Sequence, residues 1–201
     1  ENKGGLNMKN LIPTLAKDKG TGPRGAGPAA GILCLSAFAI LTMSLFWPQA
    51  ARALPKDGAV AAGSSTISQP NSTTMHINQG TQKSIINWKS YSIGTNEKVQ
   101  YFQPSSSSIS LNRVTGVDPS YIHGQLSANG QVWVINPNGL LVGSGARINV
   151  GGFVGSTLNM NNEDFMGGRY KFIMAERPGA AAAGITNMGS IEAERGGYAV
   201  L

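Results

Sequence analysis

The chain has 201 residues, of which 27 are glycine, 41% are apolar and only 13% are charged. This apolar content is enough to bury a core, which excludes a wholly disordered chain, and the composition argues against a helical bundle. The formal charge of +6 lies mostly at one end, because residues 1–53 hold six Lys or Arg against two Asp or Glu, and the rest holds ten against eight. No basic stripe is left in the body of the chain, so nucleic acid is not an expected partner.

Residues 1–53 have the organisation of an extended signal peptide. A basic stretch and a Gly/Pro-rich hinge precede an uncharged run at 32–47, and small residues follow at Ala51 and Ala53. This order predicts cleavage by signal peptidase after Ala53. The alternative is a transmembrane anchor, because the uncharged run reaches 19 residues when it is counted from Ala29. No basic stop-transfer cluster follows the run, which favours the cleaved signal.

Cysteine usage agrees with export. The single cysteine, Cys34, lies in the uncharged run, so residues 54–201 contain none. We therefore expect an exported domain that is stabilised by hydrogen-bonded strands and a repetitive core, and that is free to cross a second membrane unfolded. The chain ends inside an apolar, strand-like run at 198–201, so we expect the protein to continue beyond it.

From Leu54 onward, short stretches of alternating apolar and polar residues are separated by Asn- and Gly-containing turns. The clearest predicted strands are 73–78, 98–102, 108–114, 131–135, 147–150 and 171–174. No 12-residue stretch has the pattern of an amphipathic helix. The sequence therefore predicts an all-β chain.

The strand spacing leaves two architectures open. Residues 124–132 and 184–191 are loosely self-similar, each with a glycine, an apolar residue, an Asn/Gly turn and a further apolar residue. Short strands with such corners favour a parallel β-helix, and a two-sheet sandwich is the alternative. In a β-helix, the side chains expected to stack inward are Ile109, Leu111, Val132, Val134, Leu141, Ile148 and Val150.

Candidate catalytic residues are few. His76 and His123 have no carboxylate or cysteine at metal-ligand or triad spacing, and the serine run 105–108 lacks the setting of a nucleophile. Solvated loop charges are the commoner explanation of the carboxylates that could in principle form a glycosidase-like pair, Glu163, Asp164, Glu192 and Glu194. We expect no catalytic site, no metal and no cofactor.

The most specific local feature is Asn136-Pro137-Asn138-Gly139, directly after a predicted strand. An asparagine can bond its own backbone, proline is rigid, and an Asn-Gly pair accepts positive φ. The segment therefore predicts a tight corner between stacked coils.

Several ordered motifs resemble the N-terminal domain of filamentous-haemagglutinin-type exoproteins. Residues 85–94 (IINWKSYSIG) are similar to the IIxWxSFxIG segment of that family, and residues 124–139 (GQLSANGQVWVINPNG) resemble its most characteristic part. The family's Asn-Pro-Asn-Leu motif is absent, and the region 103–108 stands nearest to its expected place, which suggests the high-molecular-weight-adhesin-like subgroup. Besides Asn136, Pro137, Asn138 and Gly139, the residues that carry the resemblance are Trp88, Asn112, Arg113, Asn129 and Gly130.

The resemblance implies a two-partner secretion domain over residues 54–201, folded as a right-handed parallel β-helix with an N-terminal cap. Such a domain crosses the inner membrane by the general export machinery and is recognised in the periplasm of a Gram-negative bacterium by POTRA domains of an outer-membrane β-barrel transporter. It then folds outside the cell, as part of a secreted or surface-bound adhesin whose host receptor the sequence does not name. A strand-forming segment can add to a sheet edge of a POTRA domain. The alternatives are a stand-alone carbohydrate-binding β-helix adhesin and a β-helix polysaccharide-processing enzyme.

Overall fold

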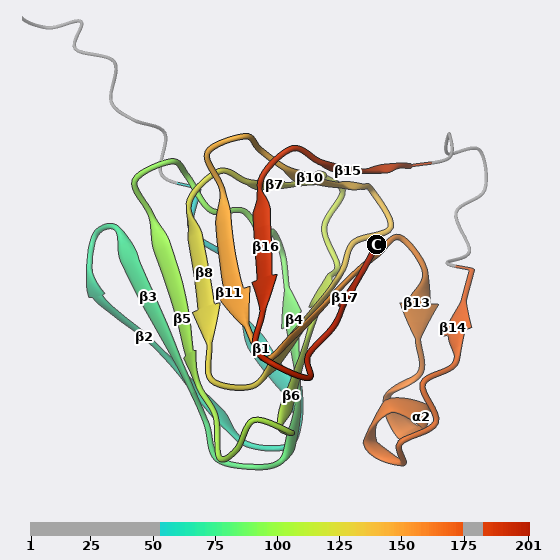
Figure 1. Ribbon diagram of the computed structural model, residues 1–201. Coiled ribbons are helices and arrows are strands. Elements are labelled where there is room, and N and C mark those ends of the chain that lie inside the picture. The colour runs from blue at the N-terminus through green and yellow to red at the C-terminus, as the bar shows by residue number, and fades with distance from the viewer. Residues whose placement is uncertain (1–52, 175–182) are drawn as a thin grey trace, which may run out of the picture. The chain divides into compact units, whose positions relative to one another are not determined.

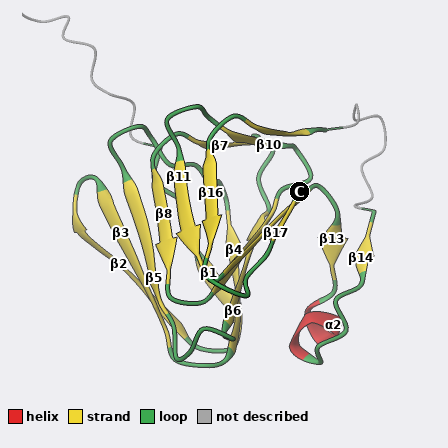
Figure 2. Ribbon diagram, in the orientation of Figure 1, coloured by secondary structure: helices red, strands yellow, loops and turns green. Residues whose placement is uncertain are grey.

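The computed structural model describes residues 53–174 and 183–201, so the predicted leader, apart from Ala53, lies outside the described residues. The described residues wind into a parallel β-solenoid, whose coils supply strands to three sheets (Figures 1 and 2). The predicted all-β fold and parallel β-helix are confirmed, and the sandwich alternative is wrong. No helix within the described residues is long and apolar enough to cross a bilayer.

The first sheet has the strand order β16-β11-β8-β5-β3-β2 and is parallel except at its β2–β3 edge. Its strands are β2 (Ser65–Asn71), β3 (Thr74–Gln79), β5 (Lys98–Phe102), β8 (Gln125–Ala128), β11 (Arg147–Val150) and β16 (Ser190–Ala193). One inward position is apolar on five successive strands and forms a continuous ladder through the core. The ladder comprises Met75, Val99, Leu126, Ile148 and Ile191.

The second sheet has the order β1-β4-β6-β9-β12-β17 and is likewise parallel except for the β1–β4 pair. Its strands are β1 (Ala59–Ala62), β4 (Lys83–Trp88), β6 (Ile109–Val114), β9 (Gln131–Ile135), β12 (Gly152–Ser156) and β17 (Ala199–Val200). The antiparallel strands β1 and β2 cover the first coil's strands in both sheets, where unpaired backbone would otherwise invite another chain. They form the predicted N-terminal cap.

A third, shorter sheet closes each coil. It has the order β15-β10-β7, all parallel, with β7 (Ser120–Ile122), β10 (Leu140–Val142) and β15 (Ile185–Asn187). The predicted strands at 98–102, 131–135 and 147–150 have the observed bounds. Those predicted at 73–78, 108–114 and 171–174 are observed as Thr74–Gln79, Ile109–Val114 and Phe172–Ile173.

The middle strands of the second sheet, β4, β6, β9 and β12, are largely buried on both faces, which the strand pattern did not predict. Its outer face carries an aligned apolar row, Ile85, Leu111, Trp133 and Val154. Residues 157–174, which we call the outer excursion, leave the coil (Figure 1), and Met160, Phe165 and Phe172 of this segment pack against the row. The excursion comprises β13 (Asn159–Met160), the five-residue helix α2 (Asn162–Met166) and β14 (Phe172–Ile173). Phe165 of α2 is fully buried against the row.

This second core explains the errors in the predicted inward residues. Val132, Val134, Ile148 and Val150 lie in the main core as predicted. Ile109 and Leu111 belong to the second core instead, so their alternation with polar neighbours pointed to the wrong face. The prediction that Leu141 stacks inward was also wrong, because its neighbours Leu140 and Val142 are the buried residues of β10.

Candidate functional site

The predicted corner lies between β9 and β10 and is built around the side chain of Asn136, which is fully buried. Its Oδ1 accepts hydrogen bonds from the backbone N–H and the Nδ2 of Asn138, both at 2.9 Å. The Gly139 N–H donates to the Asn136 carbonyl at 3.0 Å, and Gly139 has a φ of 112°, which glycine adopts far more readily than other residues. The tight corner expected from the sequence is therefore present.

The same asparagine ties its coil to the coils on both sides. Its Nδ2 donates to the Asp118 carbonyl at 3.0 Å and to the Ser120 hydroxyl at 2.9 Å, both in the preceding coil. Its backbone N–H donates to the Ser156 carbonyl of the following coil at 2.9 Å. Asn138 adds a bond from Nδ2 to the Gly116 carbonyl at 2.9 Å. Asn136 thus engages three successive coils, while Pro137 and Asn138 are half-buried.

A second corner, at Asn129-Gly130, uses related chemistry. The Asn129 amide pairs with the backbone of Gln103, accepting from its N–H and donating to its carbonyl, both at 2.7 Å. A Cβ at Gly130 would stand 2.8 Å from the carbonyl oxygens of Ser105 and Ser108, so only glycine lets the coils approach this closely. The serine run 105–108 packs into this corner, where the Ser105 hydroxyl bonds to those of Ser107 and Ser108, and Gln82 accepts from Ser105 and Ser108.

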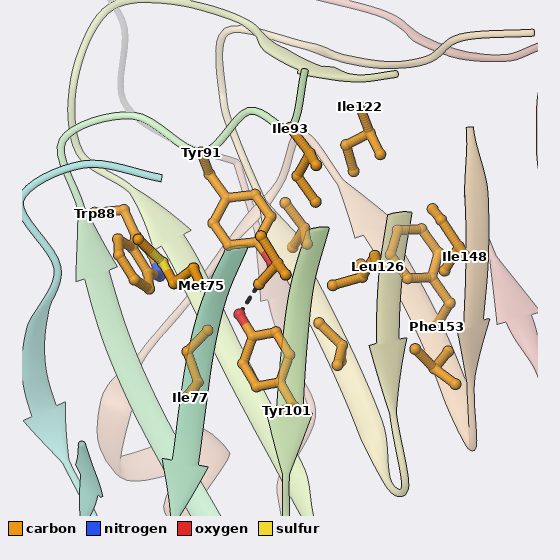
Figure 3. Close-up of a cluster of buried hydrophobic side chains, with 14 of the residues drawn as sticks. Met75, Ile77, Trp88, Tyr91, Ile93, Tyr101, Ile122, Leu126, Ile148 and Phe153 are labelled. Atoms are coloured by element: carbon orange, nitrogen blue, oxygen red, sulfur yellow. Dashed lines mark hydrogen bonds between the residues drawn. The ribbon is translucent and has the colours of Figure 1, made fainter. Parts of the chain in front are cut away.

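Trp88 and Asn112 meet in a polar network inside the main core, and Figure 3 shows Trp88 with the two tyrosines that share the network, Tyr91 and Tyr101. The Oδ1 of Asn112 accepts from the Trp88 indole N–H at 3.0 Å and from the Tyr101 hydroxyl at 2.7 Å. The Tyr101 and Tyr91 hydroxyls are 2.9 Å apart, and the dashed line in Figure 3 marks this bond. Burial raises the pKa of both phenols, most strongly that of Tyr101, which also lies beside Tyr91. The network is closed from solvent and joins three strands and a loop.

Arg113, the neighbour of Asn112, points the other way and holds the outer excursion. Its guanidinium donates to Asn159 Oδ1 at 3.0 Å, to Asn162 Oδ1 at 2.8 Å and to the Met160 carbonyl at 2.6 Å. A fourth bond, at 3.2 Å, reaches Asn87 on the neighbouring strand β4. Partial burial lowers the pKa of Arg113, although arginine stays protonated at any physiological pH.

The remaining candidate residues are dispersed. The rings of His76 and Phe102 meet edge to face at 5.2 Å, and His123 stacks on Tyr121 at 6.4 Å. Asp164 forms an ion pair with Arg169 at 2.9 Å in the outer excursion, whereas Glu192 and Glu194 lie on or next to β16. Among the described residues no group of three His, Cys, Asp or Glu is placed to hold a metal ion.

Sequence reasoning missed the residues that complete these sites. Tyr91 and Tyr101 share the network of Asn112, and Gln103 completes the second corner. Tyr91 lies within the motif at 85–94, which is the one signal that could have identified it. Gln103 lies in the region 103–108 that the family comparison already singled out, whereas Tyr101 carries no local signal, since its partners Tyr91 and Asn112 lie 10 and 11 residues away along the chain.

Comparison with known proteins assigns the domain as a whole. The family model described as TPS secretion domain matches residues 51–197. Two curated proteins named heme/hemopexin-binding protein, from Haemophilus influenzae strain Rd and from Haemophilus influenzae, are 41% identical over 110 residues and 36% identical over 118. These alignments cover 55% and 59% of this chain but only 12% and 13% of the relatives.

A solved structure agrees with the family match. The crystal structure of the HMW1 secretion domain from Haemophilus influenzae is similar to this chain with a TM-score of 0.62 and 37% sequence identity. The similarity covers 67% of this chain and 35% of that one. The parallel solenoid and the family match therefore point to the same kind of domain.

Proposed function

The chain belongs to the TPS secretion domain family, and from this premise we propose that residues 54–201 direct the export of a large exoprotein through a dedicated outer-membrane transporter. The heme/hemopexin-binding relatives extend far beyond the aligned part, which supports a domain that directs the export of a longer protein. The exported exoprotein is secreted into the medium or held at the cell surface. What those relatives bind is a property of their full length, and we do not assign it to residues 54–201.

The proposed route has two membrane steps. Residues 1–53 take the chain through the inner membrane by the general export machinery, and signal peptidase cuts after Ala53. In the periplasm of a Gram-negative bacterium, POTRA domains of the transporter bind the unfolded domain. Residues 54–201 contain no cysteine, so no disulfide can form there and hinder passage through the barrel.

The burial of Asn136 is the observation that carries the proposal. In the folded domain its side-chain polar atoms all bond within the protein and its exposed fraction is 0%. A transporter that reads Asn136 must therefore meet it before the coil closes. Strands of the unfolded chain still have free backbone N–H and C=O groups, which can add to a POTRA sheet edge, whereas most strands of the folded solenoid are paired on both sides.

Folding outside the cell then follows from the parallel coils. Each coil pairs with the one before it, so a closed coil presents the edge on which the next can form. The Asn136 corner, which engages three coils, is where closure of one coil fixes its neighbours. A coil that has closed outside the cell cannot pass back through the transporter unless it unfolds, so folding makes export directional.

The structure favours this function over the two alternatives. The two tryptophans considered for a carbohydrate-binding face, Trp88 and Trp133, are 1% and 4% exposed and belong to the two cores, so neither is available to stack on a sugar. A polysaccharide-processing enzyme needs paired carboxylates, and Asp164 is engaged by Arg169 in the outer excursion, away from the strand β16 that carries Glu192. We therefore propose a domain without catalytic activity.

The test separates secretion from stability in the same variants. Asn136→Ala and Asn138→Ala are compared with Asn149→Ala, an exposed asparagine of β11 that serves as the matched control. The extracellular yield is measured with the cognate transporter, and thermal unfolding is measured on the purified chains. We expect the yield of both corner variants to fall further than their stability, and Asn149→Ala to be exported normally.

The opposite outcome reduces the corner to an ordinary turn. If the two corner variants are exported in proportion to their remaining stability, the transporter does not read the segment. Loss of the Asn136 side chain alone should cost about 1–3 kcal/mol, since it leaves buried groups without partners. An export defect larger than this loss of stability explains is the signature of recognition.

A further inference from the structure

Glu97 is a buried carboxylate that forms no ion pair with a Lys or Arg among the described residues. It lies in the loop between β4 and β5, its exposed fraction is 6%, and the ion pair found within residues 53–174 and 183–201 is the one between Arg169 and Asp164. Taking a carboxylate out of water costs several kcal/mol unless charge and hydrogen bonds compensate. The local turn alone does not explain why a carboxylate is buried at this position.

Two backbone N–H groups donate to this carboxylate. Gly94 N–H reaches Oε2 at 2.7 Å and closes the local turn, and the Glu97 N–H donates back to the Gly94 carbonyl at 2.9 Å. The second donor comes from 44 residues away, because Ala53 N–H lies 3.0 Å from Oε1 and 3.1 Å from Oε2. One amide hydrogen is thus shared between two oxygens. An ammonium group, with three hydrogens, could serve each oxygen with its own.

The residues after Ala53 are held in place. Leu54 is 5% exposed and belongs to the main core. Lys56 bridges to the neighbouring loop, its N–H donating to the Ser90 carbonyl at 2.9 Å and its carbonyl accepting from Lys89 N–H at 3.0 Å. The chain at Ala53 and Leu54 is therefore fixed beside Glu97 by packing on its C-terminal side.

We propose that Glu97 is the receptor for the α-ammonium group that removal of the leader creates. Cleavage after Ala53 turns the amide nitrogen of Leu54 into that group, three covalent bonds from the nitrogen that Glu97 now accepts from. Hydrolysis of the Ala53–Leu54 peptide bond consumes one water, releases the leader as a carboxylate and leaves the protonated amine on the mature chain. A neutral donor to Glu97 is thereby replaced by a charged one, and the first coil is held more firmly after processing than before it.

The inference rests on the proposed processing step, and the experiment keeps the two apart. The whole chain, leader included, is exported to the periplasm of a Gram-negative host and purified. Its mass gives the site of the cut. The rate at which an amine-acylating reagent modifies the α-amine at pH 7 is then measured by peptide mapping, in the native and in the urea-unfolded protein, with the exposed Lys56 as an internal reference.

The expected result is a native α-amine that is acylated at least about tenfold more slowly than in the unfolded chain, since each pKa unit gained by the amine lowers its reactive neutral fraction about tenfold. Glu97→Gln, which keeps the size and removes the charge, should lose most of this protection. The matched control Glu194→Gln removes an exposed carboxylate instead and should behave as the parent does. If Glu97→Gln does not fold, Glu97→Asp takes its place and should give intermediate protection.

The possible outcomes separate the role of Glu97 from the processing step and from the secretion function. A native terminus of the parent that is acylated as fast as the unfolded one overturns the role of Glu97 and leaves the secretion function untouched. The same holds if Glu97→Gln folds and keeps full protection, because burial alone then shields the amine. A purified chain that retains its leader, or is cut elsewhere than next to Ala53, overturns both the processing step and the inference.

Discussion

Replacing Asn112 by alanine should destabilise the domain more than its single side chain suggests. The Oδ1 of Asn112 is the acceptor for the Trp88 indole N–H and for the Tyr101 hydroxyl, and all three side chains are at most 1% exposed. Without it the indole N–H has no acceptor. Tyr101 and Tyr91 can still bond to each other, but one of their two hydroxyl hydrogens is left without a partner.

The size of the loss follows from these two donors. Each buried donor without an acceptor costs about 1–3 kcal/mol, so Asn112→Ala should lower the free energy of unfolding by about 2–6 kcal/mol. Urea unfolding followed by tryptophan fluorescence measures it, with Asn149→Ala as an exposed control that should change by less than about 0.5 kcal/mol. In a Trp88→Phe background one donor is already gone, so the same substitution should cost about 1–3 kcal/mol less.

Either of two results would contradict the role of Asn112 as the shared acceptor of this network. A loss below about 1 kcal/mol for Asn112→Ala would mean that the polar groups find other partners or water. Strict additivity with Trp88→Phe would mean that Asn112 does not act through the indole.

Three further outcomes are expected. Gly124→Ala should lower the free energy of unfolding by at least about 2 kcal/mol, because a Cβ there would overlap two backbone carbonyl oxygens of the preceding coil. Gly184→Ala, with open space around it, should leave the free energy of unfolding unchanged. Equal effects of the two substitutions would contradict the close packing of coils. Burial raises the pKa of Tyr91 and Tyr101, so above about pH 10 only the unfolded chain releases these protons, and the free energy of unfolding should fall by up to about 2.7 kcal/mol per pH unit. The double Tyr→Phe variant should show a shallower fall in alkaline urea titrations, and an unchanged slope would rule out these phenols as its cause. Arg113→Lys should speed proteolysis within the outer excursion several-fold, because one ammonium cannot replace a guanidinium that binds four acceptors; an unchanged cleavage pattern would show that packing alone holds the excursion.

The coil structure could be predicted because it is local in sequence. The strands at 98–102 and 147–150 alternate between buried and more exposed positions, the strand at 131–135 is an apolar run after Gln131, and the corners at Asn129-Gly130 and 136–139 carry residues that accept sharp turns. Asn136 and Asn138 were identified as candidate site residues through the resemblance to the exoprotein family, since the residues by themselves predict only a tight corner.

What failed depends on contacts between coils. Alternation in β6 marks Ile109 and Leu111 as interior residues, yet a second core covers them and the polar Ser110 and Asn112 face the main core. A polar residue is tolerated there only because Trp88 and its neighbours satisfy it, and that pairing joins positions 24 residues apart. The outer excursion is likewise explained by the apolar outer row of the second sheet, which no single strand reveals.

The most direct test of the secretion function is the dependence of export on the transporter. The whole chain is produced with its cognate outer-membrane transporter, with a transporter lacking its POTRA domains, and with none, and the chain is quantified in the medium and in the periplasm. We expect the processed chain in the medium only with the intact transporter, and in the periplasm, cut after Ala53, in the other two strains. Equal amounts in the medium of all three strains would contradict the proposed role of residues 54–201 as a secretion domain.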